Sequence, residues 1–233
     1  MFYRKYGKRI FDVLSSIALL ICISPLVLLL ACKVRRHLGR PVLFTQIRPG
    51  KDGKLFRLYK FRTMTDKRDE DGNLLPDNQR MTDFGRKLRA TSLDELPELI
   101  NIIKGDMSVV GPRPQLVRDM VFFTDEEMKR QSVLPGLTGL AQISGRNNIS
   151  WDDKFTYDLQ YIRKIGYKSD FKIIFRTIAK VIHKDDISTE GMATAEDLGD
   201  YLLRIGRISK NQYDAGQSKA RRLIQKFVSE EKR

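Results

Sequence analysis

The chain has 233 residues, and its 43 lysines and arginines against 29 aspartates and glutamates give a formal net charge of +14 at pH 7. That length allows one well-buried domain with an appendage, and the charge indicates an anionic partner: a phosphorylated substrate, a nucleic acid or a membrane surface. Only two cysteines occur, Cys22 and Cys32, both in one apolar stretch. A disulfide framework and a cysteine-based zinc site are therefore disfavoured, which fits a reducing compartment.

An apolar segment without a charge runs from Val13 to Cys32, long enough for a membrane-spanning helix. No small-residue cleavage site follows it, which argues against a signal peptide. Ser24 and Pro25 interrupt the segment, and a proline inside a helix predicts a kink. Basic residues flank both ends and favour the cytoplasmic side. We therefore predict a re-entrant helix–break–helix over residues 1–40; a proline-kinked span is the alternative.

Residues 41–190 have the composition of a compact α+β domain that is mainly helical. Two strands, 42–46 and 55–64, flank a segment rich in turn formers and predict a hairpin. Residues 66–78 are polar and predict an exposed loop. Helical spacing is found at 84–90, 96–104 and 116–131, and a short strand is expected at 140–143. Thr82 or Asp83 is the expected cap of the first of these helices, and Gly105 the stop of the second.

The end of this domain and the tail are also predicted to be helical. Ser169 or Asp170 is expected to cap a basic amphipathic helix that reaches His183. Such a helix can lie in a membrane interface or pack on the protein core, and its pattern fits both. Residues 191–233 read as a C-terminal helical tail, either a partner-binding or self-association element or a solvated basic appendage.

Candidate chemistry begins with two adjacent carboxylates, Asp94 and Glu95, which follow Arg89 by about one helical turn. A structural explanation exists: Ser92 and Glu95 have capping-box spacing, and Asp94 as the cap would put Pro97 among positions whose N–H groups are unpaired anyway. The functional explanation is that Asp94 attacks a phosphorus atom while Glu95 holds Mg²⁺. The spacing leaves both open.

Two further runs present an arginine beside glycine or proline. Arg113 stands between Pro112 and Pro114, and Arg146 follows Gly145. Rigid presentation suits a guanidinium that grips phosphate oxygens, although a surface arginine in an ordinary loop has the same appearance. Neither run is a Walker loop or a dinucleotide-binding fingerprint.

Taken in order, these blocks resemble the bacterial sugar transferases, the monotopic phosphoglycosyl transferases that initiate glycan assembly on a polyprenyl carrier. The similarity covers roughly residues 5–190. It is carried by KRIFDVLSSIALLICISPLVLLL, VLFTQIRPGKDGKLFRLYKFRTM, TSLDELPELINIIKGDMSVVGPRPQL and LPGLTGLAQISGRNNISWDDKF. The chain is similar to the smallest members, which consist of the catalytic core alone.

The resemblance implies that Asp94 is the nucleophile that attacks the β-phosphorus of a UDP-sugar and expels UMP. Polyprenyl phosphate would then take the phosphosugar from the aspartate. Glu95 is implied to bind Mg²⁺. Further matching positions have implied roles: Arg89 near the phosphate of the carrier or product, Arg113 and Arg146 on the nucleotide sugar, and Lys60 and Arg62 in the same basic cleft. Asp158 and Tyr161 also match, without an assigned role.

The resemblance further implies a monotopic protein of the bacterial inner membrane with its active site facing the cytoplasm. No nucleic-acid partner is expected, and the C-terminal tail is a candidate element for self-association. Three alternatives stay open. A noncatalytic scaffold of the same fold is one, although the intact Asp94–Glu95 pair counts against it. A nucleic-acid-binding membrane protein would explain the charge, but no binding motif is present. A spanning receptor would place residues 1–9 outside the cytoplasm.

Overall fold

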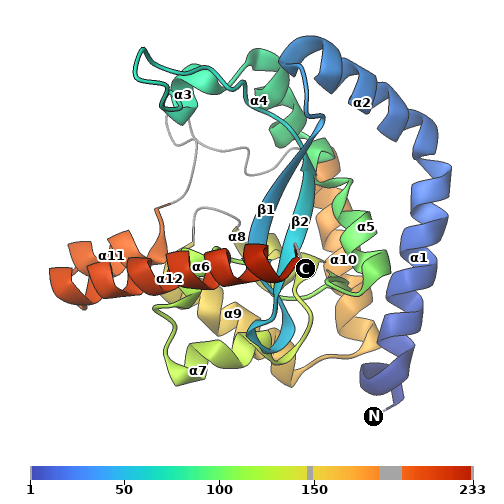
Figure 1. Ribbon diagram of the computed structural model, residues 1–233. Coiled ribbons are helices and arrows are strands. Elements are labelled where there is room, and N and C mark those ends of the chain that lie inside the picture. Colours follow the sequence, from blue (N-terminus) through green and yellow to red (C-terminus); the bar gives the residue numbers. More distant parts are fainter. Residues whose placement is uncertain (1, 146–148, 184–195, 232–233) are drawn as a thin grey trace.

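The N-terminal apolar segment forms two helices that meet at an abrupt bend (Figure 1). The computed structural model describes residues 2–145, 149–183 and 196–231. A π-helical turn, Tyr3–Gly7, leads into α1 (Lys8–Cys22), and α2 (Ser24–Leu38) follows at a 67° bend. Pro25 occupies the first turn of α2, where its missing N–H leaves no helical bond unmade, and the Ser24 hydroxyl donates to the Ile21 carbonyl at 2.8 Å. The predicted break at Ser24-Pro25 is confirmed.

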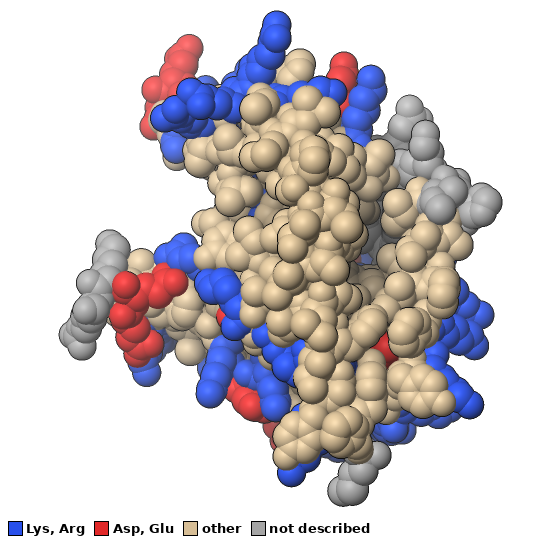
Figure 2. All heavy atoms as spheres, turned by 90° about the vertical axis from the view of Figure 1, so that its right-hand side faces the viewer, with Lys and Arg blue, Asp and Glu red and all other residues tan. Residues whose placement is uncertain are grey.

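Within the described part of the chain, no single helix is long and apolar enough to cross a membrane. The bent pair Tyr3–Cys22 and Ser24–Leu38 meets that requirement of length and composition together. Its outer surface is apolar: Ile10, Leu14, Ile21 and Leu28 are all exposed. Figure 2 shows a broad, mostly uncharged face over these helices, with lysines and arginines gathered along its edges. An exposed apolar face of this breadth is typical of an interaction surface.

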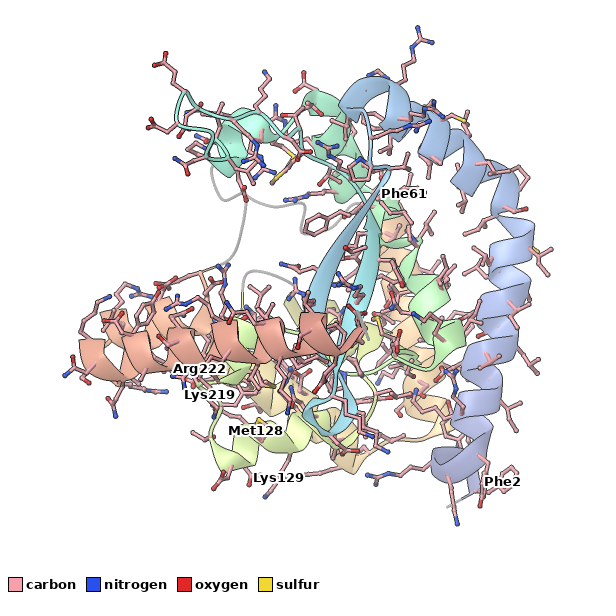
Figure 3. All side chains as sticks on the ribbon, viewed as in Figure 1. Phe2, Phe61, Met128, Lys129, Lys219 and Arg222 are labelled. Carbon is pink, nitrogen blue, oxygen red and sulfur yellow. The ribbon has the colours of Figure 1, made fainter. Side chains whose placement is uncertain are left out.

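The predicted hairpin is confirmed, with strands β1 (Leu43–Pro49) and β2 (Leu55–Phe61) paired antiparallel. A 3₁₀ turn, Lys51–Gly53, joins them. The second strand ends at Phe61, before the expected Met64. Phe61 lies near α2 in Figure 3 and is buried against it.

The helices that precede and follow the acidic pair also lie where they were predicted. A short helix, α3 (Asp77–Arg80), ends the polar loop, and α4 (Asp83–Ala90) is capped by the Thr82 hydroxyl, which accepts from the Gly85 amide at 3.0 Å. Helix α5 (Glu98–Lys104) ends at Gly105, whose φ of 98° is the left-handed conformation that glycine adopts easily.

Two buried clusters hold the link between α4 and α5 in place. One joins α2 to the end of β2 and to α4, and the other joins β2 to α5. Their buried members are Leu30, Val34, Leu38, Phe61 and Leu88 in the first, and Phe56, Leu58, Leu99, Ile102 and Met107 in the second. Leu93 and Leu96 pack against the first cluster, so the segment that carries Asp94 and Glu95 is anchored on both sides.

Two predicted elements are wrong. The helix expected over 116–131 is three short pieces, α6 (Val117–Met120), α7 (Asp125–Met128) and a 3₁₀ turn, Lys129–Ser132. Thr124 and Glu127 form a capping box that starts a new helix, and the Phe122 ring turns away into the C-terminal tail. The strand expected at 140–143 belongs to α8 (Leu140–Gly145).

The strand in that region lies slightly earlier in the chain. It is β4 (Gly136–Thr138), which pairs in parallel with β3 (Ser108–Val110). A Cβ on Gly136 would lie 2.1 Å from the amide nitrogen of Gly111, so glycine is required for the approach. The described residues therefore form a mainly helical α+β structure with two small sheets, as predicted.

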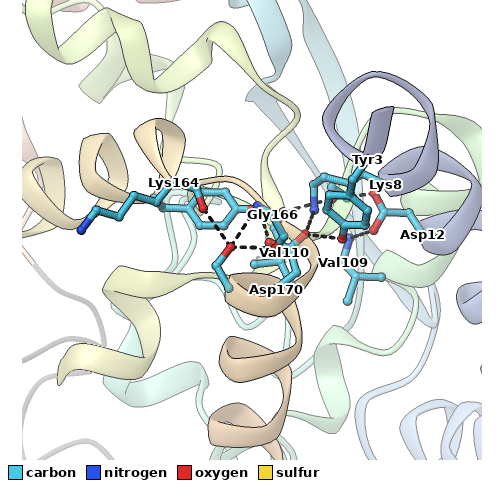
Figure 4. Close-up of polar contacts among 11 residues, drawn as sticks. Tyr3, Lys8, Asp12, Val109, Val110, Lys164, Gly166 and Asp170 are labelled. Atoms are coloured by element: carbon cyan, nitrogen blue, oxygen red, sulfur yellow. Dashed lines mark hydrogen bonds and ion pairs between the residues drawn. The ribbon is translucent and has the colours of Figure 1, made fainter. Parts of the chain in front are cut away.

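The basic amphipathic helix is α10 (Tyr167–His183), which follows α9 (Trp151–Arg163). It begins before both predicted caps, so that prediction is wrong. Instead of capping, Asp170 is buried and accepts from Tyr3, Lys8 and Tyr161 at 2.7, 2.7 and 2.9 Å (Figure 4). Phe171, Phe175 and Ile178 are exposed on α10, and Phe11 of α1 packs on Phe171.

A second buried carboxylate ties α1 to the rest of the domain. Asp12 accepts from the Ser108 hydroxyl at 2.6 Å and the Val109 amide at 3.1 Å. Arg9 donates to the carbonyls of Ile102 and Ile103 at the end of α5. Because these partners lie on two different elements, β3 and the end of α5, helix α1 is fixed in orientation relative to the domain.

The C-terminal tail packs on the domain instead of extending into solvent. Its helices are α11 (Leu198–Arg204) and α12 (Lys210–Glu231). Asp119 of α6 accepts from the Leu198 amide at 2.9 Å, and the Phe122 ring stacks on Tyr213. At the other end of α12, Glu231 pairs with Arg57 of the hairpin at 2.6 Å. Lys219 and Arg222 project from the exposed side of α12 (Figure 3).

Candidate active site

Asp94 and Glu95 lie in a 3₁₀ turn, Leu93–Glu95, between α4 and α5. Ser92 precedes this turn in the left-handed conformation, with φ of 55°. Among the described residues the Ser92 side chain makes no capping hydrogen bond, and the residue at the cap position of α5 is Pro97. The capping explanation of Asp94 is therefore wrong. Asp94 is nevertheless only 8% exposed, and an ionisable side chain is seldom buried to this extent unless it is paired or has a function.

Glu95 is held by two cations from different elements. Lys60 Nζ of β2 lies 2.7 Å from Glu95 Oε1, and an Arg113 guanidinium nitrogen lies 2.6 Å from the same oxygen. Burial works to raise the pKa of Glu95, but Arg113 and Lys60 together outweigh it and hold that pKa well below its usual range. Glu95 is therefore ionised at neutral pH.

Asp94 has the opposite electrostatic environment. Burial and the neighbouring charge of Glu95 raise its pKa to about 6, although Lys60, Arg89 and Arg113 act in the other direction. Its carboxylate makes no hydrogen bond or ion pair within the described ranges. Two adjacent acids are thus driven apart in pKa, which is typical of carboxylates with different chemical roles.

The other three predicted site residues, Arg89, Arg62 and Arg146, differ in what the structure shows of them. Arg89 of α4 donates to the Thr63 hydroxyl at 3.0 Å and acts on Asp94 by its charge. Arg62 pairs with Asp66 at 2.6 Å and donates to the carbonyls of Arg40 and Met64. Its role in substrate binding stays a prediction. Arg146 lies outside the described residues.

Arg130, which the sequence did not single out, anchors the loop that carries Arg113. It donates to the Arg113 carbonyl at 2.7 Å and pairs with Asp158 at 2.6 Å, and both charged side chains are 3% exposed. The Arg48 guanidinium donates to the Pro114 carbonyl at 3.2 Å. Asp158 therefore positions a loop, while Tyr161 donates to the Val110 carbonyl and to Asp170.

Glu98, the first residue of α5, was also missed. Its side chain is 2% exposed, and its Oε1 lies 3.1 Å from Lys60 Nζ. The geometry is that of an ion pair without an aligned hydrogen bond, so Glu98 Oε1 has no hydrogen-bond partner in the described part of the chain. Burial raises the pKa of Glu98 to about 7, although Lys60 opposes the change. The sequence signal that could have identified Glu98 was its position shortly after the acidic pair, in Leu93-Asp94-Glu95-Leu96-Pro97-Glu98.

The residues present fit a magnesium ion that is shared with a substrate. Over the described ranges, no group of three histidine, cysteine, aspartate or glutamate side chains is arranged to hold a metal. Mg²⁺ commonly takes only one or two carboxylates, together with waters and substrate phosphates. Glu95 supplies one such carboxylate, and both cations engage the same one of its two oxygens.

A carboxylate pair surrounded by lysine and arginine is a site for anionic, phosphorylated substrates. The comparison with known proteins agrees with this class: the model of the family described as bacterial sugar transferase matches residues 3–184, and the chain belongs to that family. The resemblance inferred from the sequence is confirmed, and so is the prediction that the chain is an enzyme of this family. Helices α11 and α12 lie beyond the matched residues.

Three relatives illustrate the range of the family. An uncharacterized sugar transferase, EpsL, of Bacillus subtilis is 49% identical over 81% of this chain and 94% of its own length. The exopolysaccharide production protein ExoY of Rhizobium meliloti is 39% identical over 75% of the chain and 85% of its own length. An undecaprenyl-phosphate galactose phosphotransferase of Salmonella typhimurium is 37% identical over 78% of the chain, which spans 41% of that relative.

Proposed function

We propose that the protein transfers a phosphosugar from a UDP-sugar to undecaprenyl phosphate or a similar polyprenyl phosphate, with release of UMP. The observation that carries this proposal is the buried Asp94 beside a Glu95 bound by Lys60 and Arg113. Family membership and the names of the relatives support the class of reaction. The product would begin the assembly of a membrane-linked glycan such as a capsule or an exopolysaccharide.

The reaction has two displacement steps at one phosphorus atom. A carboxylate oxygen of Asp94 attacks the β-phosphorus of the UDP-sugar, and the bond from that phosphorus to the UMP oxygen breaks, which leaves an aspartyl phosphosugar. A phosphate oxygen of the polyprenyl phosphate then attacks the same phosphorus and restores the Asp94 carboxylate. Arg113, Lys60 and Arg89 neutralise the charge that both substrates bring. Glu95 would hold a magnesium ion, which would supply further neutralisation.

The apolar N-terminal helices support a membrane location. The acceptor's lipid tail stays in the bilayer, so the site must lie at headgroup depth. The exposed apolar face of α1 and α2, together with Phe171 and Phe175 on α10, suits a shallow insertion in which the basic residues along its edges meet the headgroups. We infer a re-entrant helix pair in the inner membrane, with both ends of the pair on the cytoplasmic side.

This topology predicts where an N-terminal cysteine is accessible. In a background with Cys22→Ala and Cys32→Ala, a Phe2→Cys reporter should resist a membrane-impermeant maleimide in intact spheroplasts and react after lysis. Ser229→Cys, on exposed α12, is the matched cytoplasmic control. Labelling of Phe2→Cys but not of Ser229→Cys in intact spheroplasts would instead establish a spanning helix.

The raised pKa of Asp94 predicts how the reaction depends on pH. Only the ionised carboxylate attacks phosphorus, and with a pKa of about 6 its ionised fraction falls as the pH drops through that value. We expect kcat/KM for the donor to decline about tenfold for each unit below pH 6. Initial rates of UMP release between pH 5 and 8 test this, with full recovery at pH 8 as the control for folding. A flat profile down to pH 5 contradicts it.

The proposed function is tested by Mg²⁺-dependent UMP release from the detergent-purified protein. Undecaprenyl phosphate and a panel of UDP-sugars are supplied, and EDTA and the omission of the acceptor are the controls. Release with one class of donor establishes the reaction and identifies the sugar. Silence across a broad panel, from protein shown to be folded, favours the noncatalytic scaffold.

A further inference from the structure

Lys60 lies between two carboxylates that have very different access to substrate. Its Nζ is 2.7 Å from Glu95 Oε1 and 3.1 Å from Glu98 Oε1. The Glu95 side chain is 18% exposed, whereas that of Glu98 is 2% exposed. Glu95 can therefore be reached by a ligand while Glu98 stays enclosed behind the lysine.

A role for Glu98 in the helix alone does not explain its burial. An acidic side chain in the first turn of α5 interacts favourably with the helix dipole, but an exposed side chain at this position would do the same. A carboxylate enclosed with a single ion-pair partner in the described part of the chain is costly, and burial accordingly raises the pKa of Glu98 to about 7. An apolar residue would fill this place more easily, so the oxygen acceptor that Glu98 presents to Lys60 has another use.

The two cations on Glu95 differ in how firmly they are held. Arg113 is 40% exposed, and within the described residues its side chain is held by Glu95. Lys60 is 17% exposed and has Glu98 as a second partner. When a metal binds the Glu95 carboxylate and the donor's phosphates enter the site, the Arg113 side chain is able to leave Glu95 and bind the phosphates. Lys60 would then lose Glu95 as its principal ion-pair partner, and a second acid is needed to keep the Lys60 ammonium in place.

We infer that Glu98 is a positioning residue, which holds the Lys60 ammonium beside Asp94 once substrate and metal have taken Glu95. This inference rests on the proposed function. Glu98 does not touch the reacting atoms; it keeps one cation oriented toward the transferring phosphoryl group, where a displaced charge is far less effective. Its loss should therefore lower kcat and leave donor binding, in which the exposed Arg113 takes part, nearly unchanged.

The test is a double-mutant cycle on UMP release. Glu98→Met has a similar volume and no acceptor, and we expect it to lower kcat about tenfold or more, with the KM for the UDP-sugar within about threefold of wild type. Glu98→Gln retains an amide oxygen for Lys60 and should recover most of that loss. In a Lys60→Met background, Glu98→Met should cause no further decrease, because its effect passes through the lysine.

Several outcomes would overturn the inference. These are a wild-type kcat in Glu98→Met, a loss that multiplies with that of Lys60→Met, or a loss that Glu98→Gln shares in full. Thermal melts verify folding, and Glu98→Ala takes the place of Glu98→Met in the same cycle if the latter is unfolded. An inactive wild-type protein would instead count against the proposed function, so the two failures are distinguishable.

Discussion

Asp94→Asn should reduce UMP release at least about a thousandfold, because removal of a covalent nucleophile leaves only binding and electrostatic contributions. Asparagine has nearly the same shape as aspartate but cannot form the aspartyl phosphosugar. The comparison with wild type is made at saturating donor, with Mg²⁺ and undecaprenyl phosphate present. Equal release by both proteins would remove Asp94 from the mechanism.

The same substitution should not harm the fold. The pKa of Asp94 is raised to about 6 in the folded protein, so its ionised form is less favourable there than in the unfolded chain. The free energy of unfolding therefore decreases as the pH rises from the pKa that Asp94 has in the unfolded chain toward 6. At pH 7 this contribution of Asp94 has reached its full size. A neutral asparagine avoids it and should stabilise the protein by about 1 to 3 kcal/mol at pH 7. Inactivity with a raised melting temperature would separate chemistry from folding.

Intact-mass measurement gives a second readout of the same residue. Wild-type protein quenched with the UDP-sugar alone should carry the mass of one phosphosugar, which disappears when undecaprenyl phosphate is added. Asp94→Asn should carry none. Glu95→Gln is the informative neighbour, since it retains the nucleophile but loses the carboxylate that Lys60 and Arg113 bind. A persistent adduct in Asp94→Asn would place the covalent bond on another residue.

Local signals in the sequence predicted the elements whose causes are themselves local. Pro25 bends the apolar segment, Thr82 caps α4 and Gly105 ends α5, because each acts on its own backbone or on the turn beside it. The acidic pair and Arg113 were identified in the same way, from a short run that carries the family pattern. These features need no knowledge of what packs against them.

The predictions that failed depended on partners far away in the chain. Asp170 has capping chemistry, yet Tyr3 and Lys8 recruit it from more than 160 positions away. The strand β4 is three residues long and exists because β3 lies beside it, so no alternation within 140–143 was informative. Periodicity over 116–131 was interrupted because Phe122 packs against the tail helices.

The buried ion pair between Arg130 and Asp158 also joins residues that are far apart in the chain. Its loss is the second large effect that we predict. Asp158→Ala leaves the Arg130 guanidinium buried without its carboxylate partner. Loss of one member of a buried ion pair destabilises a protein by about 3 to 5 kcal/mol. For a chain of this size we expect a fall in melting temperature on the order of 10 °C, measured in detergent without substrate.

The matched control removes both charges together. In Arg130→Met/Asp158→Leu no charge remains buried and unpaired, so much of the lost stability should return, as it does when buried ion pairs are replaced by apolar residues. Activity should not return with it, because the Arg113 carbonyl then lacks its 2.7 Å hydrogen bond and the loop loses its fixed position. A higher KM for the UDP-sugar in a thermally stable double variant would show that this pair serves the orientation of Arg113. A wild-type KM would confine the pair to stability, and the rigid presentation of Arg113 would then rest on its two flanking prolines and on Arg48.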